Sequence, residues 1–250
     1  MPLAHGAELD CLIEPYVVVN VSAPVDGLVE RVEVDRGDVV EEGQVLAVLE
    51  SSVQQATLAI ARARAEMDTS IEAGKVRLDY SIRKVANNEK LLQEGGISER
   101  EVDEARAQRD LNVIAIVEAQ ENKRLAELDM KRAEAELGIR TIRSPINGVV
   151  MERLLSAMEQ MKQTPIVKLA QLDPLRVEVF APIALLGKIA VGMTVQVRPE
   201  APVGGAYPAR VTVVDRVVDA ASGTFGVRLE LPNPGNRLPA GLKCRIVFSQ

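Results

Sequence analysis

The nine residues VSAPVDGLV, at Val21–Val29, return in near copy as IRSPINGVV at Ile142–Val150. The two prolines, Pro24 and Pro145, stand 121 residues apart (145 − 24 = 121). Each copy ends a strand at its proline, turns at Asp-Gly or Asn-Gly, and starts a new strand at the next apolar pair, because both turn dipeptides tolerate positive φ. The repeat is either two copies of one domain or two halves of one domain separated by an insertion.

The small size of each repeated unit favours two halves of one domain. A single strand–turn–strand unit is marginal because a lone hairpin buries little apolar surface, whereas two related units can share a core. We therefore expect one β-domain from residues 17–51 and 142–169, with Pro24 and Pro145 at equivalent places.

The second half is less regular than the first. Met158 stands where the first half has Gly37, and Gln163 or Thr164 stands where it has Gly43. Its hairpins are therefore less strongly specified than those of the first half.

Residues 52–141 have the composition of a long helical segment. Ala, Glu, Lys, Arg, Leu and Gln, which are strong helix formers, dominate this proline-free stretch. Apolar residues recur there at steps of seven, which predicts a coiled-coil seam. The columns are Ile71, Leu78, Val85 and Leu92; Val102, Ile116, Met130 and Leu137; and Ala105, Ala119, Ala126 and Ala133. The last two columns are interrupted by Arg109, Lys123 and Asn112.

The segment EGGISERE predicts a tight turn at 94–98 between two helices. Gly95 and Gly96 are placed to end the first helix in a left-handed residue. Ser98 is an expected N-cap, with Glu101 at the capping-box spacing. So short a loop makes the two helices antiparallel. With roughly 40 residues in each helix, the hairpin would extend about 60 Å.

The chain returns to alternating apolar and polar residues after the helical segment. Five or so strands separated by Gly and Pro turns predict a small antiparallel β-barrel from residues 1–16 and 170–250. One short helix is expected at Pro182–Val191, with Pro182 at an early helical position and Gly192 as its stop.

Charge and composition exclude several kinds of site. The formal net charge is −6, which argues against a nucleic-acid partner because such partners need clustered positive charge. The only histidine is His5, and Cys11 and Cys244 form no Cys-x-x-Cys motif. We therefore predict no metal site, no catalytic residue and no His-dependent triad.

Neither a membrane span nor a secretory signal is found in the sequence. No apolar run approaches the roughly 18 residues that a transmembrane helix needs, and the N-terminus has no basic segment followed by an apolar one. We expect either a cytoplasmic protein or a signal or anchor that is not present in this chain.

Three segments carry a resemblance to a known family. VSAPVDGLVERVEVDRGDVVEEGQVLAVLES resembles one half of a biotinyl/lipoyl-type fold. LRVEVFAPIALLGKIAVGMTVQV and GTFGVRLELPNPGNRLPAGLKCRIVF are similar to a β-barrel pattern that follows such a fold. In this order, from about Val17 to Phe248, they resemble the membrane fusion proteins, the HlyD-like periplasmic adaptor subunits of efflux pumps and type I secretion systems.

The resemblance implies an elongated α+β molecule. It would consist of a split biotinyl/lipoyl-like β-sandwich with an inserted antiparallel α-helical coiled-coil hairpin, and a small antiparallel β-barrel. Full-length pump adaptors also have a membrane-proximal domain beyond the barrel, which we expect to be absent from this chain.

The resemblance also implies a function. Such adaptors are non-enzymatic, need no cofactor and lie in the periplasm, anchored to or associated with the inner membrane. They link an inner-membrane transporter, of the resistance-nodulation-division or ABC type, to a TolC-like outer-membrane channel. Their working assemblies are homo-oligomers, which implies a hexamer here.

A partner contact at the hairpin tip is implied as well. Resistance-nodulation-division adaptors carry an Arg, a Leu and a Ser around the tip, and these residues contact the exit duct. In NNEKLLQEGGIS, Leu91 and Ser98 match, whereas the Arg position falls on Asn87. From the residues alone, Ser98 is already explained as a helix cap, and Leu91 is equally explained as a seam residue.

Two other functions stay open. A carrier domain of an enzyme complex, bearing biotin or lipoate, needs an exposed Lys at the hairpin joining its halves, but that junction here is LESS at 49–52. A structural coiled-coil scaffold is compatible with the periodicity.

Two further features leave alternatives open. Cys11 and Cys244 could meet in a disulfide, which would imply an oxidising compartment, or remain two buried free thiols. A second apolar stripe on the helical segment predicts packing against a neighbouring protomer. Its members are Leu111, Ile114, Leu125 and Leu128.

Overall fold

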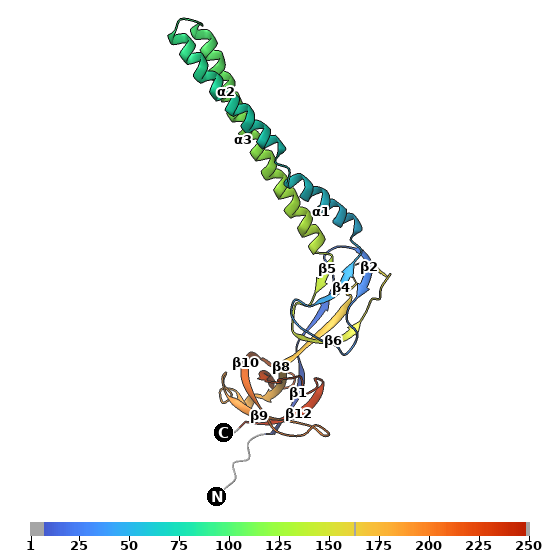
Figure 1. The fold of residues 1–250 in the computed structure, drawn as a ribbon. Helices are drawn as coiled ribbons and strands as arrows, with labels where there is room; N and C mark the ends of the chain where they lie inside the picture. Colours follow the sequence, from blue (N-terminus) through green and yellow to red (C-terminus); the bar gives the residue numbers. More distant parts are fainter. Residues whose placement is uncertain (1–7, 163, 249–250) are drawn as a thin grey trace. The chain divides into compact units, whose positions relative to one another are not determined.

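The structure is a computed structural model that describes residues 8–162 and 164–248. Residues 1–7 of the expected barrel, and Gln163, lie outside the described residues. The chain divides into two compact units (Figure 1). The β unit is formed by Met1–Glu50 and Thr141–Gln250, and the helical unit by Ser51–Arg140.

The β unit is built from antiparallel strands in two sheets. The eight-stranded sheet has the order β1-β12-β9-β10-β11-β8-β6-β3, and β1 also pairs with β8, which closes six of its strands into a barrel. The four-stranded sheet has the order β5-β4-β2-β7. The strands are β1 (Glu8–Val21), β2 (Gly27–Val32), β3 (Val39–Val40), β4 (Val45–Leu49), β5 (Thr141–Arg143), β6 (Gly148–Arg153), β7 (Gln160–Met161), β8 (Val167–Pro182), β9 (Thr194–Pro199), β10 (Tyr207–Asp219), β11 (Thr224–Leu231) and β12 (Leu242–Val247).

Two long strands, β1 and β8, contribute to two separate apolar cores. The first part of β1, with Leu9 and Ile13, packs into the barrel core. Its last residue, Val21, packs into the second core, which is the core of a barrel-sandwich domain. The register between β1 and β8 shifts between Pro15 and Val17, so a β-bulge separates the two parts of the strand.

The barrel-sandwich domain is pseudo-symmetric. The Gly37 N–H donates to the Val150 carbonyl at 2.9 Å, and the Met158 N–H, 121 residues further on, donates to the Val29 carbonyl at 2.8 Å. The short strand β3 pairs with β6 in the same way that β7 pairs with β2.

Both copies of the repeated phrase therefore belong to one domain. Val29 and Val150 lie in the same buried core. Pro24 and Pro145 occupy the bends just before β2 and β6 respectively. The prediction of two halves of one domain is confirmed.

The helical unit is an antiparallel hairpin whose first arm is broken. It consists of α1 (Ser52–Ala65), α2 (Thr69–Gln93) and α3 (Glu99–Gly138). The prediction of one continuous first helix is wrong, because the helix stops at Ala65 and a new one starts after Asp68, its N-cap. Figure 1 shows this break beside the uninterrupted α3.

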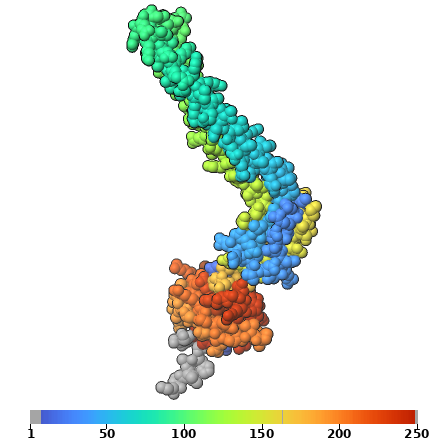
Figure 2. Space-filling model, viewed as in Figure 1, coloured from blue at the N-terminus to red at the C-terminus, as the bar shows by residue number. Residues whose placement is uncertain are grey.

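The predicted seam lies between the two arms. Val85, Val102, Ala105 and Ala133 are buried, and the other members of the columns are half-buried. Gly74 adds a close approach that the columns did not show, because a Cβ there would stand 2.8 Å from Ile116 Cγ1. In Figure 2 the hairpin is a narrow rod, so most of its side chains reach solvent.

The prediction of a helix at Pro182–Val191 is wrong. Only a three-residue 3-10 helix, η1 (Ile183–Leu185), forms there. The Leu186 N–H closes onto the Ile183 carbonyl at 2.9 Å, and Gly187 then adopts a φ of +83°, which ends the turn.

Candidate functional site at the hairpin tip

The first side of the tip is the end of α2. The Gly96 N–H donates to the Leu91 carbonyl at 2.8 Å, and the Gly95 N–H donates to the Leu92 carbonyl at 3.0 Å. Gly95 has a φ of +76°. This pair of bonds around a left-handed glycine is a Schellman motif, which satisfies carbonyls that the helix end would leave unpaired.

The second side of the tip is the start of α3. The Ser98 hydroxyl accepts from the Glu101 N–H at 3.4 Å, and the Glu101 carboxylate accepts from the Ser98 N–H at 2.8 Å. The predicted capping box is therefore confirmed. The bond from the Ser98 N–H, together with one from the Ser98 hydroxyl, lowers the pKa of Glu101 below its ordinary value.

The structure places the three tip residues differently. Asn87 and Leu91 are exposed, and they lie one helical turn apart on the same face of α2. The alternative that Leu91 is a seam residue is wrong, because it is 42% exposed while its neighbour Leu92 occupies the seam column. Ser98 is exposed, but both of its polar groups are engaged in the cap.

Two cross-helix contacts near the tip were missed by sequence reasoning. Arg106 forms an ion pair with Glu89 at 2.7 Å, and this bond raises the pKa of Arg106 above its ordinary value. The Asn88 amide reaches across to the Glu101 carbonyl at 3.4 Å. Both contacts lie beside the seam columns. The opposite charges of Arg106 and Glu89, which flank the seam, were the sequence signal that could have predicted the ion pair.

The tip combines one exposed leucine with a capped turn. Among the described residues, no group of three or more His, Cys, Asp or Glu is placed to hold a metal ion. Leu91 is an exposed apolar side chain in the last turn of α2, Ile97 in the connecting turn is half-buried, and caps fix both helix ends. A rigid turn with one exposed leucine is suited to docking onto another protein.

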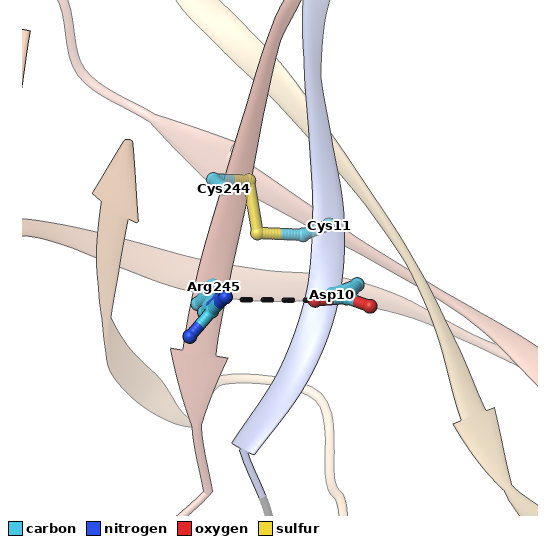
Figure 3. Close-up of a disulfide and its surroundings, with 4 residues drawn as sticks. All are labelled: Asp10, Cys11, Cys244 and Arg245. Atoms are coloured by element: carbon cyan, nitrogen blue, oxygen red, sulfur yellow. Dashed lines mark ion pairs between the residues drawn. A yellow bond between two sulfur atoms is a disulfide. The ribbon is translucent and has the colours of Figure 1, made fainter. Parts of the chain in front are cut away.

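The two cysteines, which lie near opposite ends of the sequence, are joined within the β unit. A disulfide links Cys11 of β1 to Cys244 of β12, which are direct register partners with their Cα atoms 4.8 Å apart (Figure 3). They are 7% and 1% exposed. Beside them, Arg245 forms an ion pair with Asp10 at 4.0 Å.

No helix in the described parts of the chain combines the length and the apolar character needed to cross a membrane.

Comparison with known families matches both parts of the β unit. Residues 17–170 match the model of the CzcB-like barrel-sandwich hybrid domain, and residues 175–250 match that of the CusB-like beta-barrel domain. The chain belongs to the membrane fusion protein family. The match over 17–170 includes the hairpin, so in this membrane fusion protein the helices are an insertion within the barrel-sandwich domain.

Several relatives of this membrane fusion protein have names that refer to export or to multidrug resistance. The pyoverdine export membrane fusion protein PvdR of Pseudomonas aeruginosa is 30% identical over 72% of this chain and 48% of its own length. The multidrug resistance protein MdtE of Escherichia coli K12 is 26% identical over 94% of this chain and 62% of its own length. The chain thus spans about half of PvdR and somewhat more of MdtE.

Solved structures show the same fold. MacA from Actinobacillus actinomycetemcomitans superposes with a TM-score of 0.82 and 24% identity, over 99% of this chain and 79% of that one. ZneB from Cupriavidus metallidurans superposes with a TM-score of 0.54 and 24% identity, over 98% of this chain and 70% of that one.

Proposed function

We propose that this membrane fusion protein is a non-enzymatic periplasmic adaptor, associated with the inner membrane, that links an inner-membrane transporter to an outer-membrane exit duct. The observation that carries the proposal is the hairpin inserted into a pseudo-symmetric barrel-sandwich domain, with a capped, rigid turn at its far end. The names of PvdR and MdtE, which refer to export and multidrug resistance, support a role in efflux.

The proposed mechanism is geometric. The 40 residues of α3 extend about 60 Å at 1.5 Å per residue, so the turn can contact a partner far from the helix base. Leu91, with Asn87 beside it, supplies the contact, and Ser98 holds the turn in shape. The proposed partner at the tip is a TolC-like outer-membrane channel, and the transporter is of the resistance-nodulation-division or ABC type.

The disulfide supports the proposed location in the periplasm. Disulfides persist in oxidising compartments such as the bacterial periplasm and are rare in the cytosol. The bond between Cys11 and Cys244 therefore supports a periplasmic location and does not favour a cytoplasmic coiled-coil scaffold.

A biotin or lipoate carrier function is not favoured. The junction after β4 leads directly into α1, and Ser51 at that junction is only 5% exposed. No lysine stands at 49–52 to be modified. Intact mass of the protein from its native host tests this point, since a lipoyl or biotinyl adduct would contradict the adaptor proposal.

The outer face of α3 supports a homo-oligomer, which we take to be a hexamer in the working assembly. Leu111, Ile114, Leu125 and Leu128 are between 52% and 59% exposed. Burying such a stripe against a second copy would remove apolar surface from water. Leu125→Asp is therefore expected to abolish assembly measured by analytical ultracentrifugation with the partner present, and unchanged assembly would exclude this stripe.

The central experiment is capture of the exit duct by tip variants. Leu91→Asp is expected to lower crosslinking to the outer-membrane channel in host cells, together with export, because a carboxylate replaces the exposed apolar contact. Leu186→Asp is the matched control, since Leu186 is similarly exposed but belongs to the β unit. Equal crosslinking in both variants would reject the tip contact, and normal export after gene deletion would reject the adaptor function.

A further inference from the structure

The break in the first arm of the hairpin coincides with a charged residue in the seam. Lys123 falls in the same column as Ile116 and Met130, where a coiled coil places apolar side chains. Its side chain is 29% exposed. A charge at such a position is costly unless it has a partner.

The partner of Lys123 is Asp68, the N-cap residue of α2. The Lys123 ammonium donates to the Asp68 carboxylate across the hairpin. Asp68 makes no side-chain cap bond to its own helix, so this carboxylate is turned toward α3 instead. The bond to Asp68 raises the pKa of Lys123 above its ordinary value.

Two open grooves lie between the arms near this bridge. A cavity of about 310 Å³ lies beside it, lined in part by Met67, Ile71 and Ala119. A second cavity, of about 290 Å³, follows between α1 and α3, lined in part by Ala61 and Ala133. Small side chains such as Ala61, Ala119 and Ala133 line these grooves, which are partly open to solvent.

Helix α1 contacts α3 along the hairpin, with half-buried side chains such as Leu58 and Ala61. Its only buried residue is Ala65, while Val53 and Ile60 are 67% and 57% exposed. A second cross-helix ion pair, Arg62 with Glu134 at 3.5 Å, has both side chains about half exposed and contributes little. Nearer the tip, α2 buries Val85 and packs Gly74 closely against α3, and another open groove, of about 550 Å³, is lined in part by Tyr80 and Asn112.

We propose that the Asp68–Lys123 bridge is a latch at a joint in the hairpin. While the bridge is closed, the break at 66–68 is fixed against the continuous α3. When it opens, α1 separates from α3 and the first arm bends at the joint, while the tip half stays packed. The latch goes beyond the adaptor function, because it concerns the internal mechanics of the hairpin and holds whichever partner the tip contacts.

Amide hydrogen exchange on the full chain tests the latch. Asp68→Asn keeps a favourable N-cap residue and removes the charge, and Lys123→Met keeps a long side chain and removes the ammonium. Both are expected to speed exchange at 60–68 by roughly two- to fivefold, because an ion pair with an exposed partner contributes on that order. Exchange at 85–105 is expected to stay at its original rate.

Two further variants make the result decisive. Lys131→Met removes an exposed lysine from α3 and is expected to leave exchange at 60–68 unchanged. The double variant is expected to exchange no faster than either single variant, since both remove the same bridge. Unchanged exchange in both single variants, acceleration that reaches the tip equally, or slower exchange in Lys123→Met would each overturn the latch.

Discussion

Phe225 and Leu46 in the β unit are almost wholly removed from solvent, whereas the helical unit buries no side chain larger than Val85 and Val102. The β unit also joins its first and last strands covalently. The helical unit relies on local devices, namely a Schellman motif, a capping box and a narrow seam. Non-local contacts thus stabilise the β unit, whereas contacts within a few residues or within one seam stabilise the helical unit.

The contrast predicts unequal sensitivity to substitution, and the largest effect concerns the disulfide. Replacing Cys11 and Cys244 by Ser is expected to lower the free energy of unfolding of the β unit by up to about 5 kcal/mol, because the bond closes a very long loop. Guanidinium unfolding followed by amide exchange in β12 and α2 measures each unit separately. An equal loss in α2 would show that the two units do not unfold independently.

The second effect compares leucines in the two cores. Leu46→Ala in the barrel-sandwich core is expected to cost about 3 kcal/mol, since the side chain is fully buried. Leu92→Ala in the seam is expected to cost much less, because that side chain is already half-exposed. Denaturant titration of both variants checks the order, and a larger loss for Leu92 would contradict the comparison.

The third effect is confined to the hairpin. Ser98→Ala is expected to destabilise the hairpin by about 1 kcal/mol, because the first turn of α3 loses its cap. Thermal unfolding followed by helical circular dichroism measures the loss. Ser70→Ala, an exposed serine inside α2, is the matched control and is expected to change little.

The same cap gives the hairpin a dependence on pH. The folded state lowers the pKa of Glu101, so its contribution is present at pH values above the ordinary value of 4.5 and is lost as the pH falls through the folded value. Glu101→Gln is expected to reduce this loss, since Gln keeps an acceptor but does not titrate over that range. Identical acid melts for the two proteins would contradict the assignment.

The smallest effect tests the pseudo-symmetry. Met158 has a φ of 67°, while its counterpart Gly37 has a φ of 95°. Met158→Gly is therefore expected to stabilise the β unit by about 0.5 kcal/mol, after the entropy cost of glycine is subtracted from the relief of strain. Gly37→Ala is expected to act in the opposite direction, and denaturant midpoints of the two variants compare them.

Much of this fold was predictable because it is specified by short stretches of sequence. The turn at Gly95 and the cap at Ser98 each depend on backbone preferences within a few residues. The positive φ expected at Gly27 and Gly148 is not found, and Gly148 instead allows a close approach, because a Cβ there would stand 2.3 Å from the Ala170 carbonyl oxygen. The seam columns follow from the helical period alone. At the candidate site, the cap was predictable, whereas the exposure of Leu91 next to Leu92 required the actual rotation of α2 against α3.

Other features were decided only by the tertiary structure. The sequence determined that two half-domains surround a helical hairpin, but it left open whether Cys11 and Cys244 pair, because their contact depends on closing β1 against β12 across 233 residues. The partner of Lys123 was likewise hidden, since the first arm had to break at 66–68 before Asp68 could reach it. Local preferences are encoded locally, whereas these contacts exist only once distant segments have packed together.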